Sequence, residues 1–199
     1  MVENIHSEIR EIKNYAKVKS VPIMNDDGIN YLTNFIIKQK VKKVLEIGTA
    51  IGYSSIMMAL CNPLVEITSI ERDEIRYLEA LKNIKKLKLE DRITLIYNDA
   101  LDTNITDMYD LIFIDAAKGQ NINFFERFEN NLNTDGYIIT DNMNFHGLVL
   151  EDEINIKSKN LRSLIRKIKA YKNYLIEKEG YITEFLNVGD GLAVTKKVK

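Results

Sequence analysis

The stretch V-L-E-I-G-T-A-I-G-Y-S-S, residues 44–55, predicts the arrangement around which the rest of the chain is built. It begins with a short apolar run typical of a buried parallel strand, and Gly48 and Gly52 follow at once. We expect a sharp turn and then a helix over 54–61, because glycine permits the turn and lets a ligand approach the main chain. The spacing G-x-x-x-G differs from the dinucleotide fingerprint and argues against a nicotinamide or flavin enzyme. Either a nucleoside-bearing cofactor or an ordinary strand-to-helix turn fits this pattern.

Composition indicates one soluble domain. The chain has 199 residues, 45% hydrophobic and 29% charged, which is ordinary for a globular protein that buries a full core. Its net charge of -1 gives no overall attraction for nucleic acid, so any such partner needs a local basic patch. The single cysteine, Cys61, excludes an intramolecular disulfide. No apolar run approaches a membrane span and the charged start lacks a signal-peptide core, so we expect a cytoplasmic protein without a membrane partner.

Periodic apolar residues predict a helical addition over residues 1–40, ahead of a core over 41–199 within the same domain. The first helix ends before Pro22, and Asn25, Asp26 or Asp27 caps the second. Another helix is expected over 73–87, with an apolar face made of Ile75, Leu78, Leu81 and Ile84. The strands expected after residue 61 are 65–70, 92–97, 110–115, 137–140, 181–188 and 192–196. This alternation predicts a parallel α/β sheet with helices on both faces, and the tight turn 189–191 makes the closing strand pair antiparallel.

Two acidic residues at strand ends are candidates for binding a nucleoside. Glu71 closes the second strand about 20 residues past the glycine turn, where a carboxylate can accept hydrogen bonds from ribose hydroxyls. Asp99 follows the third strand and could accept from an adenine amino group, or cap the short helix that begins after it. Both residues lie where ligands bind in such sheets, beyond the carboxyl ends of the strands.

Three oxygen-bearing side chains follow two later strands. Asp115, Asp141 and Asn142 supply two carboxylates and an amide oxygen, which are hard ligands suited to Mg²⁺ or a similar cation. Each aspartate alone would more often be a cap, but together they predict a metal site. Lys118 follows in D-A-A-K-G-Q and could reach the same pocket as a base or an orienting group. Its alternative is a solvated surface lysine.

Six motifs in order resemble the cation-dependent O-methyltransferases of the catechol and caffeoyl-CoA group, a seven-stranded Rossmann-like class I methyltransferase fold with one antiparallel strand. They are E-I-G-T-A-I-G-Y-S-S, E-R at 71–72, N-D-A at 98–100, D-A-A-K-G-Q at 115–120, D-N at 141–142 and V-G-D-G-L-A at 188–193. The resemblance implies a homodimer, Mg²⁺ held by Asp115, Asp141 and Asn142, and Lys118 as catalytic lysine with Asp115. The residues implied to hold S-adenosyl-L-methionine are Glu46, Gly48, Ser54, Glu71, Asp99, Ala100 and Asp115.

The acceptor is the open question, because catechol and 5-hydroxyuridine both present two neighbouring oxygens to one metal geometry. V-P-I-M at 21–24 and a basic helix are most similar to bacterial tRNA 5-hydroxyuridine methyltransferases, so tRNA is the expected partner. On that helix Arg162, Arg166 and Lys169 line up and could contact RNA phosphates, although such a run is often a solvated face. A small catechol-like or caffeoyl-CoA-like phenol is the first alternative, and a non-catalytic cofactor- or RNA-binding module is the second. Asn144 and His146 depart from the family pattern on the expected substrate side of the metal.

Overall fold

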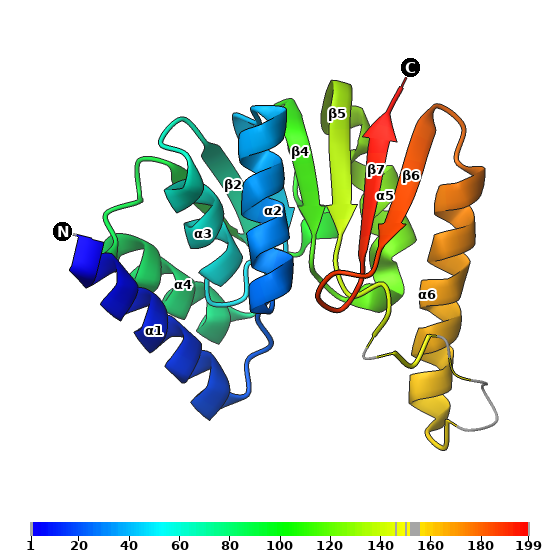
Figure 1. Cartoon of the computed structure of the whole chain (residues 1–199), viewed down its shortest axis with the longest axis horizontal. Helices are drawn as coiled ribbons and strands as arrows, with labels where there is room; N and C mark the ends of the chain where they lie inside the picture. The colour runs from blue at the N-terminus through cyan, green and yellow to red at the C-terminus, as the bar shows by residue number, and fades with distance from the viewer. Residues whose placement is uncertain (1, 146, 150, 152–155, 199) are drawn as a thin grey trace.

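A seven-stranded sheet runs through the centre of the computed structural model, which describes residues 2–145, 147–149, 151 and 156–198 (Figure 1). Along the sheet the strands are ordered β3-β2-β1-β4-β5-β7-β6. Their bounds are β1 Lys43–Ile47, β2 Glu66–Glu71, β3 Ile93–Tyr97, β4 Tyr109–Ile114, β5 Leu132–Thr140, β6 Tyr181–Leu186 and β7 Leu192–Lys197. The pairs among β1 to β5 are parallel, and β7 is antiparallel to both of its neighbours. The predicted sheet with one antiparallel strand is confirmed.

Helices cover both faces of the sheet, as the alternation predicts. The helices are α1 Val2–Lys19, α2 Asp26–Gln39, α3 Tyr53–Cys61, α4 Glu74–Lys86, α5 Asn121–Phe128 and α6 Lys159–Glu177. Successive strand residues point to opposite faces, so Val44 packs in the core beneath α1, α2 and α3, while Leu45 packs beneath α5 and α6. Asn25 is the residue that caps α2, because its side chain accepts from the Gly28 N–H. No helix in the described part of the chain is long and apolar enough to cross a membrane.

The predicted apolar face of α4 is wrong in part. Ile84 is buried, but Ile75 is 75% exposed and Leu78 is 55% exposed. Residues three apart fall about 60° short of a full helical turn at each step, so Ile75 and Ile84 lie on opposite sides of the helix. The face that packs against the sheet is instead formed by Ala80, Asn83 and Ile84.

The strand order brings the chemically interesting residues to one edge. β1 lies between β2 and β4, so the chain turns away from β1 at the position where connections leave toward opposite faces of the sheet. Register pairs Ile47 with Ile114, and Ile114 with Thr140. The residues that follow these three strand ends are Gly48, Asp115 and Asp141, and they meet side by side at a switch point where open α/β sheets bind ligands.

Candidate active site

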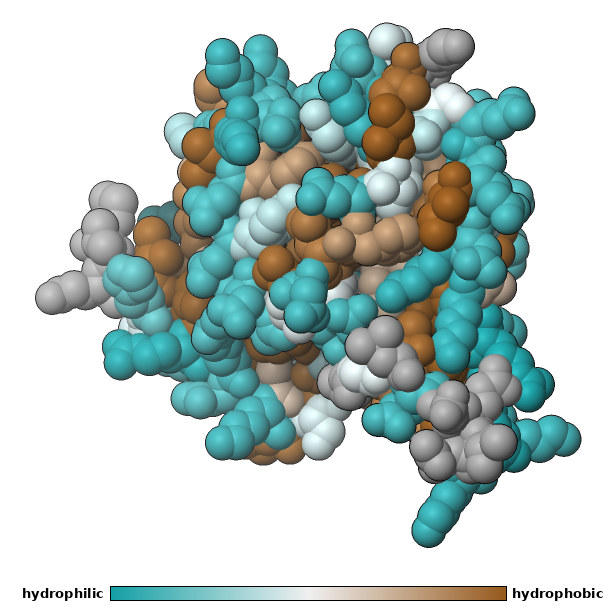
Figure 2. Space-filling view, turned by 45° about the vertical axis from the view of Figure 1, so that its right-hand side comes forward, coloured by the Kyte–Doolittle hydropathy of each residue, from teal (hydrophilic) through white to brown (hydrophobic). Residues whose placement is uncertain are grey.

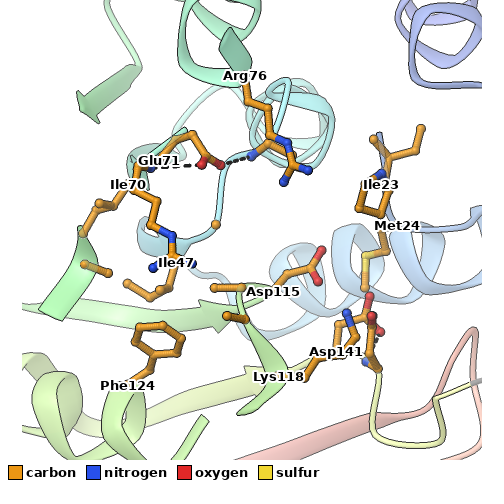
Figure 3. Close-up of a pocket in the computed structure, with 18 of the residues that line it drawn as sticks. Ile23, Met24, Ile47, Ile70, Glu71, Arg76, Asp115, Lys118, Phe124 and Asp141 are labelled. Atoms are coloured by element: carbon orange, nitrogen blue, oxygen red, sulfur yellow. Dashed lines mark hydrogen bonds between the residues drawn. The ribbon is translucent and has the colours of Figure 1, made fainter. Parts of the chain in front are cut away.

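A cavity of about 530 Å³ opens at this edge of the sheet (Figure 3). Its wall includes residues from the ends of β1, β2, β3, β4 and β5, and the α1–α2 linker 22–25. At one end lie Ile47, Ile70 and Phe124, and at the other Lys118, Asp141 and Met24. Of the sequence-predicted site residues, the wall contains Gly48, Glu71, Asp99, Ala100, Asp115, Lys118, Asp141 and Asn142. Five of the seven cofactor candidates and all three metal candidates therefore share one cavity.

The turn after β1 requires glycine for two reasons. Gly48 has a φ of +100°, and a Cβ atom there would lie 2.5 Å from the carbonyl oxygen of Asp115. Gly48 and Thr49 both donate their N–H groups to the carbonyl of Ile70. The turn is therefore fixed to β2 on one side, and it approaches the backbone after β4 as closely as the absence of a side chain allows.

The Glu71 carboxylate is fixed by the main chain around it. One oxygen accepts the Ala50 N–H at 2.8 Å, and the other accepts those of Arg72 at 2.9 Å and Asp73 at 2.8 Å. The side chain is buried but lines the cavity. An oriented carboxylate at this position retains lone pairs for further donors, as the ribose hypothesis requires.

Asp99 caps a short helix, which is one of the two roles predicted for it. Its Oδ1 accepts the Leu101 N–H at 3.0 Å at the start of a short 3-10 helix, Ala100–Asp102. Its Oδ2 accepts from Arg72 Nη1, also at 3.0 Å. The hydrogen bond from Leu101 and then the Arg72 guanidinium hold the pKa of this carboxyl below its usual range. A cap does not remove Asp99 from the site, because the residue also lines the cavity.

Glu46 and Ser54 lie behind the glycine turn, outside the described cavity wall. The fully buried Glu46 carboxylate accepts hydrogen bonds from the hydroxyls of Ser54, Ser55 and Ser69. Burial raises the pKa of Glu46, and the three hydroxyls act in the opposite direction. These two candidates form a polar support beneath the turn, and their role in binding a cofactor stays a prediction.

The two metal-candidate carboxylates oppose each other electrostatically. Enclosure and then the charge of Asp141 raise the pKa of Asp115 well above its usual value, while the charge of Lys118 lowers it. Burial likewise raises the pKa of Asp141. Asn142 adopts a left-handed φ of +65° and donates its N–H to Asp141 Oδ1 at 2.6 Å. This region concentrates negative charge in a confined space. The positive charge of Lys118 partly offsets it and lowers the pKa of both carboxyl groups.

Within the described residues, no group of three His, Cys, Asp or Glu side chains is placed to hold a metal ion. The predicted set differs from such a group because it has two carboxylates and one amide oxygen. The described cavity wall contains no His or Cys, so its polar atoms suit a hard cation rather than a soft one. Metal binding by Asp115, Asp141 and Asn142 therefore stays a prediction that the donor chemistry supports.

Several cavity residues come from segments to which the sequence assigns no site role. Met24 and Phe145 line the cavity, and the ring of Phe145 lies 5.7 Å from Lys118 Nζ. Asp190 also lines it, from the turn between β6 and β7. The motifs V-P-I-M and V-G-D-G mark these segments in the sequence, but only the fold shows that they reach the metal candidates.

The prediction for Asn144 is corrected by the structure. Asn144 is absent from the described cavity wall, and its side chain donates to Asn187 Oδ1 at 2.9 Å. Its backbone N–H donates to the carbonyl of Asp190 at 2.8 Å. Asn144 thus fastens the loop after β5 to the β6–β7 turn instead of facing an acceptor. His146 lies outside the described residues.

The basic helix α6 contains the residues predicted to contact RNA. Arg162 donates to the backbone carbonyls of Ile156 at 2.5 Å and Lys157 at 3.3 Å, so its guanidinium supports the chain before the helix. Arg166 is exposed and Lys169 is half-buried. In Figure 2 the side of the molecule that carries α6 is turned toward the viewer, and its surface mixes hydrophilic side chains with hydrophobic ones. RNA contact by these residues remains a prediction.

Comparison with known proteins identifies the family. A model of the O-methyltransferase family matches residues 2–198. A caffeoyl-CoA O-methyltransferase of Stellaria longipes is 32% identical over 180 residues, covering 84% of this chain and 73% of that protein. A Staphylococcus aureus structure named a "putative caffeoyl-CoA O-methyltransferase" is 37% identical with a TM-score of 0.90, covering 98% of this chain and 97% of that one. A Bacillus cereus O-methyltransferase solved with SAH is 23% identical, with a TM-score of 0.82 and coverages of 96% and 90%.

The chain belongs to the O-methyltransferase family. This membership confirms the resemblance to the caffeoyl-CoA group and the predicted enzyme class, an S-adenosylmethionine-dependent O-methyltransferase. It argues against a non-catalytic module. The comparisons do not show the narrower likeness to tRNA 5-hydroxyuridine methyltransferases.

Proposed function

We propose that this protein transfers the methyl group of S-adenosylmethionine to one of two neighbouring oxygens on a small catechol-like or caffeoyl-type phenol, using a divalent cation such as Mg²⁺. The observation that carries the proposal is the convergence of Asp115, Lys118, Asp141 and Asn142 in the same cavity as Glu71. One enclosure thereby brings together the carboxylate proposed to bind ribose and the oxygen atoms proposed to hold the cation. Relatives named caffeoyl-CoA O-methyltransferases support a phenolic acceptor.

The charge of the site supports a cation. Burial and the charge of Asp141 raise the pKa of Asp115, burial and the charge of Asp190 raise the pKa of Asp141, and the charge of Lys118 lowers both. Together with the Asn142 amide, Asp115 and Asp141 would hold a hard divalent ion, whose charge offsets their repulsion. When bound, such an ion lowers the pKa of an acceptor hydroxyl, so that an oxygen nucleophile can exist near neutral pH.

The side chains of the cavity would bind the cofactor and the acceptor and orient them for transfer. Glu71 would accept hydrogen bonds from the ribose hydroxyls and place the sulfonium toward Asp115. Lys118 would orient the acceptor by donating a hydrogen bond from Nζ to one of its oxygens. Met24 and Phe145 give this end of the cavity an apolar wall on which an aromatic ring can rest. Transfer of a methyl group needs the oxygen in line with the carbon–sulfur bond, which such fixed walls enforce.

5-Hydroxyuridine in tRNA is the second candidate acceptor, and the basic residues of α6 are the observation in its favour. The structure weakens that observation at one position, because Arg162 is already engaged with backbone carbonyls. Arg166 and Lys169 are the other two residues of α6 that would contact RNA phosphates. The homodimer is likewise a proposal that rests on the family resemblance.

The experiment offers labelled S-adenosylmethionine together with a catechol-type phenol or with tRNA bearing 5-hydroxyuridine, with Mg²⁺ or with a chelator. We expect label in the phenol, only when the cation is present. The same assay with Asp141→Asn should show at least about a hundredfold loss, by analogy with removal of a residue that stabilises developing charge. Asp91→Asn changes an exposed aspartate far from the cavity and serves as the matched control.

Equal label with the chelator would refute the role of the cation. Label in tRNA at far lower acceptor concentration than in the phenol would replace the small acceptor by RNA. In that case Arg166→Ala and Lys169→Ala should weaken tRNA methylation and reduce its salt dependence. An unaltered rate in Asp141→Asn would remove that residue from the site.

A further inference from the structure

The loop after β5 is fastened by Asn144, two residues beyond the cation candidate Asn142. Its backbone N–H donates to the carbonyl of Asp190 at 2.8 Å, and its side-chain amide donates to Asn187 Oδ1 at 2.9 Å. The amide oxygen of the same side chain accepts a hydrogen bond from Lys172 Nζ at 3.5 Å. One asparagine therefore joins this loop both to the β6–β7 turn and to α6 (Figure 1).

The Asn144 side chain also packs directly against the β6–β7 turn. Gly191 has a φ of +85°, and a Cβ atom there would lie 2.6 Å from Asn144 Cγ and 2.8 Å from its Nδ2. Beside this contact, the Met143 N–H donates to the Gly191 carbonyl at 2.9 Å. An apolar side chain of the same shape could fill the place of Asn144, but it could form neither side-chain hydrogen bond.

The cation candidates need such support because Asn142 has an unfavourable backbone conformation. Its φ of +65° lies in the left-handed region, where residues other than glycine persist only if the surrounding structure fixes them. Its N–H donates to Asp141 Oδ1 at 2.6 Å, so the backbone at Asn142 also directs that carboxylate. The Asp141 N–H donates to the Ile114 carbonyl at 3.1 Å. β4 therefore holds the start of this short segment, and Asn144 holds its end.

Lys172 reaches Asn144 from a half-buried position on α6. Its Nζ lies 5.6 Å from the centre of the Phe185 ring. Burial lowers the pKa of the amine, as expected for a cation that has lost part of its water. A hydrogen bond in such surroundings is stronger than one on an open surface. By its charge alone, however, a lysine near the loop would disfavour a bound cation.

We propose that Asn144 and Lys172 are positioning residues that hold Asp141 and Asn142 in the geometry that binds the divalent cation. The proposal rests on the proposed use of a cation. Asn144 acts through the backbone of the loop, and Lys172 acts through Asn144. The cation affinity of the site thereby depends on α6 and on the β6–β7 turn, which supply none of the predicted metal ligands.

Binding of Mn²⁺, followed through the electron paramagnetic resonance signal of the free ion, tests this proposal without measuring catalysis. Mn²⁺ prefers the same oxygen ligands as Mg²⁺. Leucine branches at the same carbon as asparagine, so Asn144→Leu keeps the shape and removes both side-chain hydrogen bonds. We expect about tenfold weaker binding, the lower end of the range for residues that orient metal ligands. Asn173→Leu makes the same change at an exposed position of α6 and should leave binding unchanged.

Lys172→Met distinguishes the hydrogen-bonded link from the charge of the lysine. Loss of the link should weaken Mn²⁺ binding about threefold, whereas loss of a positive charge alone would strengthen it. In the Asn144→Leu background the same substitution should cause no further weakening, because the link is already broken. Lys172→Met leaves the packing of the loop on the β6–β7 turn intact, so it tests the link even if Asn144→Leu fails to fold.

Binding of S-adenosylhomocysteine separates positioning from a general loss of structure. Its affinity should stay within about twofold in every variant, because Glu71 and Asp99 lie at other strand ends. The proposal is overturned if Asn144→Leu or Lys172→Met binds Mn²⁺ as tightly as the unmodified protein, if their effects add, or if both ligands weaken equally. An unmodified protein that does not bind Mn²⁺, or binding that Asp141→Asn leaves unchanged, would instead refute the proposed cation site.

Discussion

Gly48→Ala tests whether the close approach of the β1 turn to the β4 end is essential. The φ of +100° at Gly48 is a conformation that residues with a Cβ rarely adopt. The added carbon would also lie 2.5 Å from the Asp115 carbonyl oxygen, 2.9 Å from its carbonyl carbon and 3.0 Å from Ala116 Cα. All three atoms belong to the backbone, so relief requires the chain at Asp115 to move.

The expected loss of stability has two parts. The positive φ costs about 1–2 kcal/mol for a residue with a Cβ. Displacement of packed backbone adds about 1–3 kcal/mol, as in overpacked cores. Gly180→Ala separates them, because Gly180 has a φ of +78° and a Cβ atom added there would meet no described atom within 4 Å. Gly180→Ala should therefore lose only the stability that the positive φ costs.

Urea unfolding of the two variants measures the difference. We expect Gly48→Ala to be less stable than Gly180→Ala by at least about 1 kcal/mol, with an equal dependence on urea concentration. Because the displaced atoms carry Asp115, Gly48→Ala should also weaken the effect of Mg²⁺ on methyl transfer, which Gly180→Ala should leave intact. If the two variants are equally stable, the approach of the turn to Asp115 is not tight and the reasoning fails.

Three further predictions concern the same molecule. Since the pKa of Asp115 is raised in the folded state, its charged form destabilises the fold at neutral pH, and the penalty fades as the pH falls through the folded pKa. Without added cation, Asp115→Asn should therefore resist urea better than the unmodified protein near about pH 7, and the difference should shrink toward about pH 4. Arg162→Ala should lower the unfolding free energy by about 1–2 kcal/mol through loss of its carbonyl contacts, with phenol methylation unchanged. Gly191→Ala should reduce both stability and cation response, as its Cβ would lie 2.6 Å from Asn144 Cγ; circular dichroism and the labelled-methyl assay check this.

The sheet could be predicted from sequence because its signals are local. Short apolar runs bounded by glycine and acidic residues mark the parallel strands, and a switch point fixes where their ends meet. The alternation of side chains between the two faces of a strand also predicts that Glu46 points away from the cavity. Residues two apart on a strand share a face, so Glu46 points with Val44 toward α3 and its serines, and away from the cavity that Ile47 lines.

Contacts between distant segments could not be read from such patterns. Met24 reaches the cavity because α1 and α2 fold back over the sheet, and nothing in V-P-I-M states where that linker lies. Asn25 shows the same limit, since a Cβ at Gly189 would lie 2.8 Å from its Oδ1. The linker of the helical addition, the β6–β7 turn and the loop after β5 therefore converge on the site through packing that only the whole fold specifies.

Three features of this site are unfavourable for the stability of the fold. Folding alone would favour an amide in place of Asp115, glycine in place of Asn142 at its left-handed φ, and more space between the chain segments at Gly48 and Asp115. Each feature has a separate local cause, yet all of them lie where β1, β4 and β5 end. A positive ligand is the one addition that turns the carboxylates from a liability into a source of binding energy. The stability of Asp115→Asn should therefore be compared with that of the unmodified protein, with and without Mg²⁺. If Mg²⁺ stabilises the unmodified protein more than the variant, the unfavourable carboxylate serves to bind the cation.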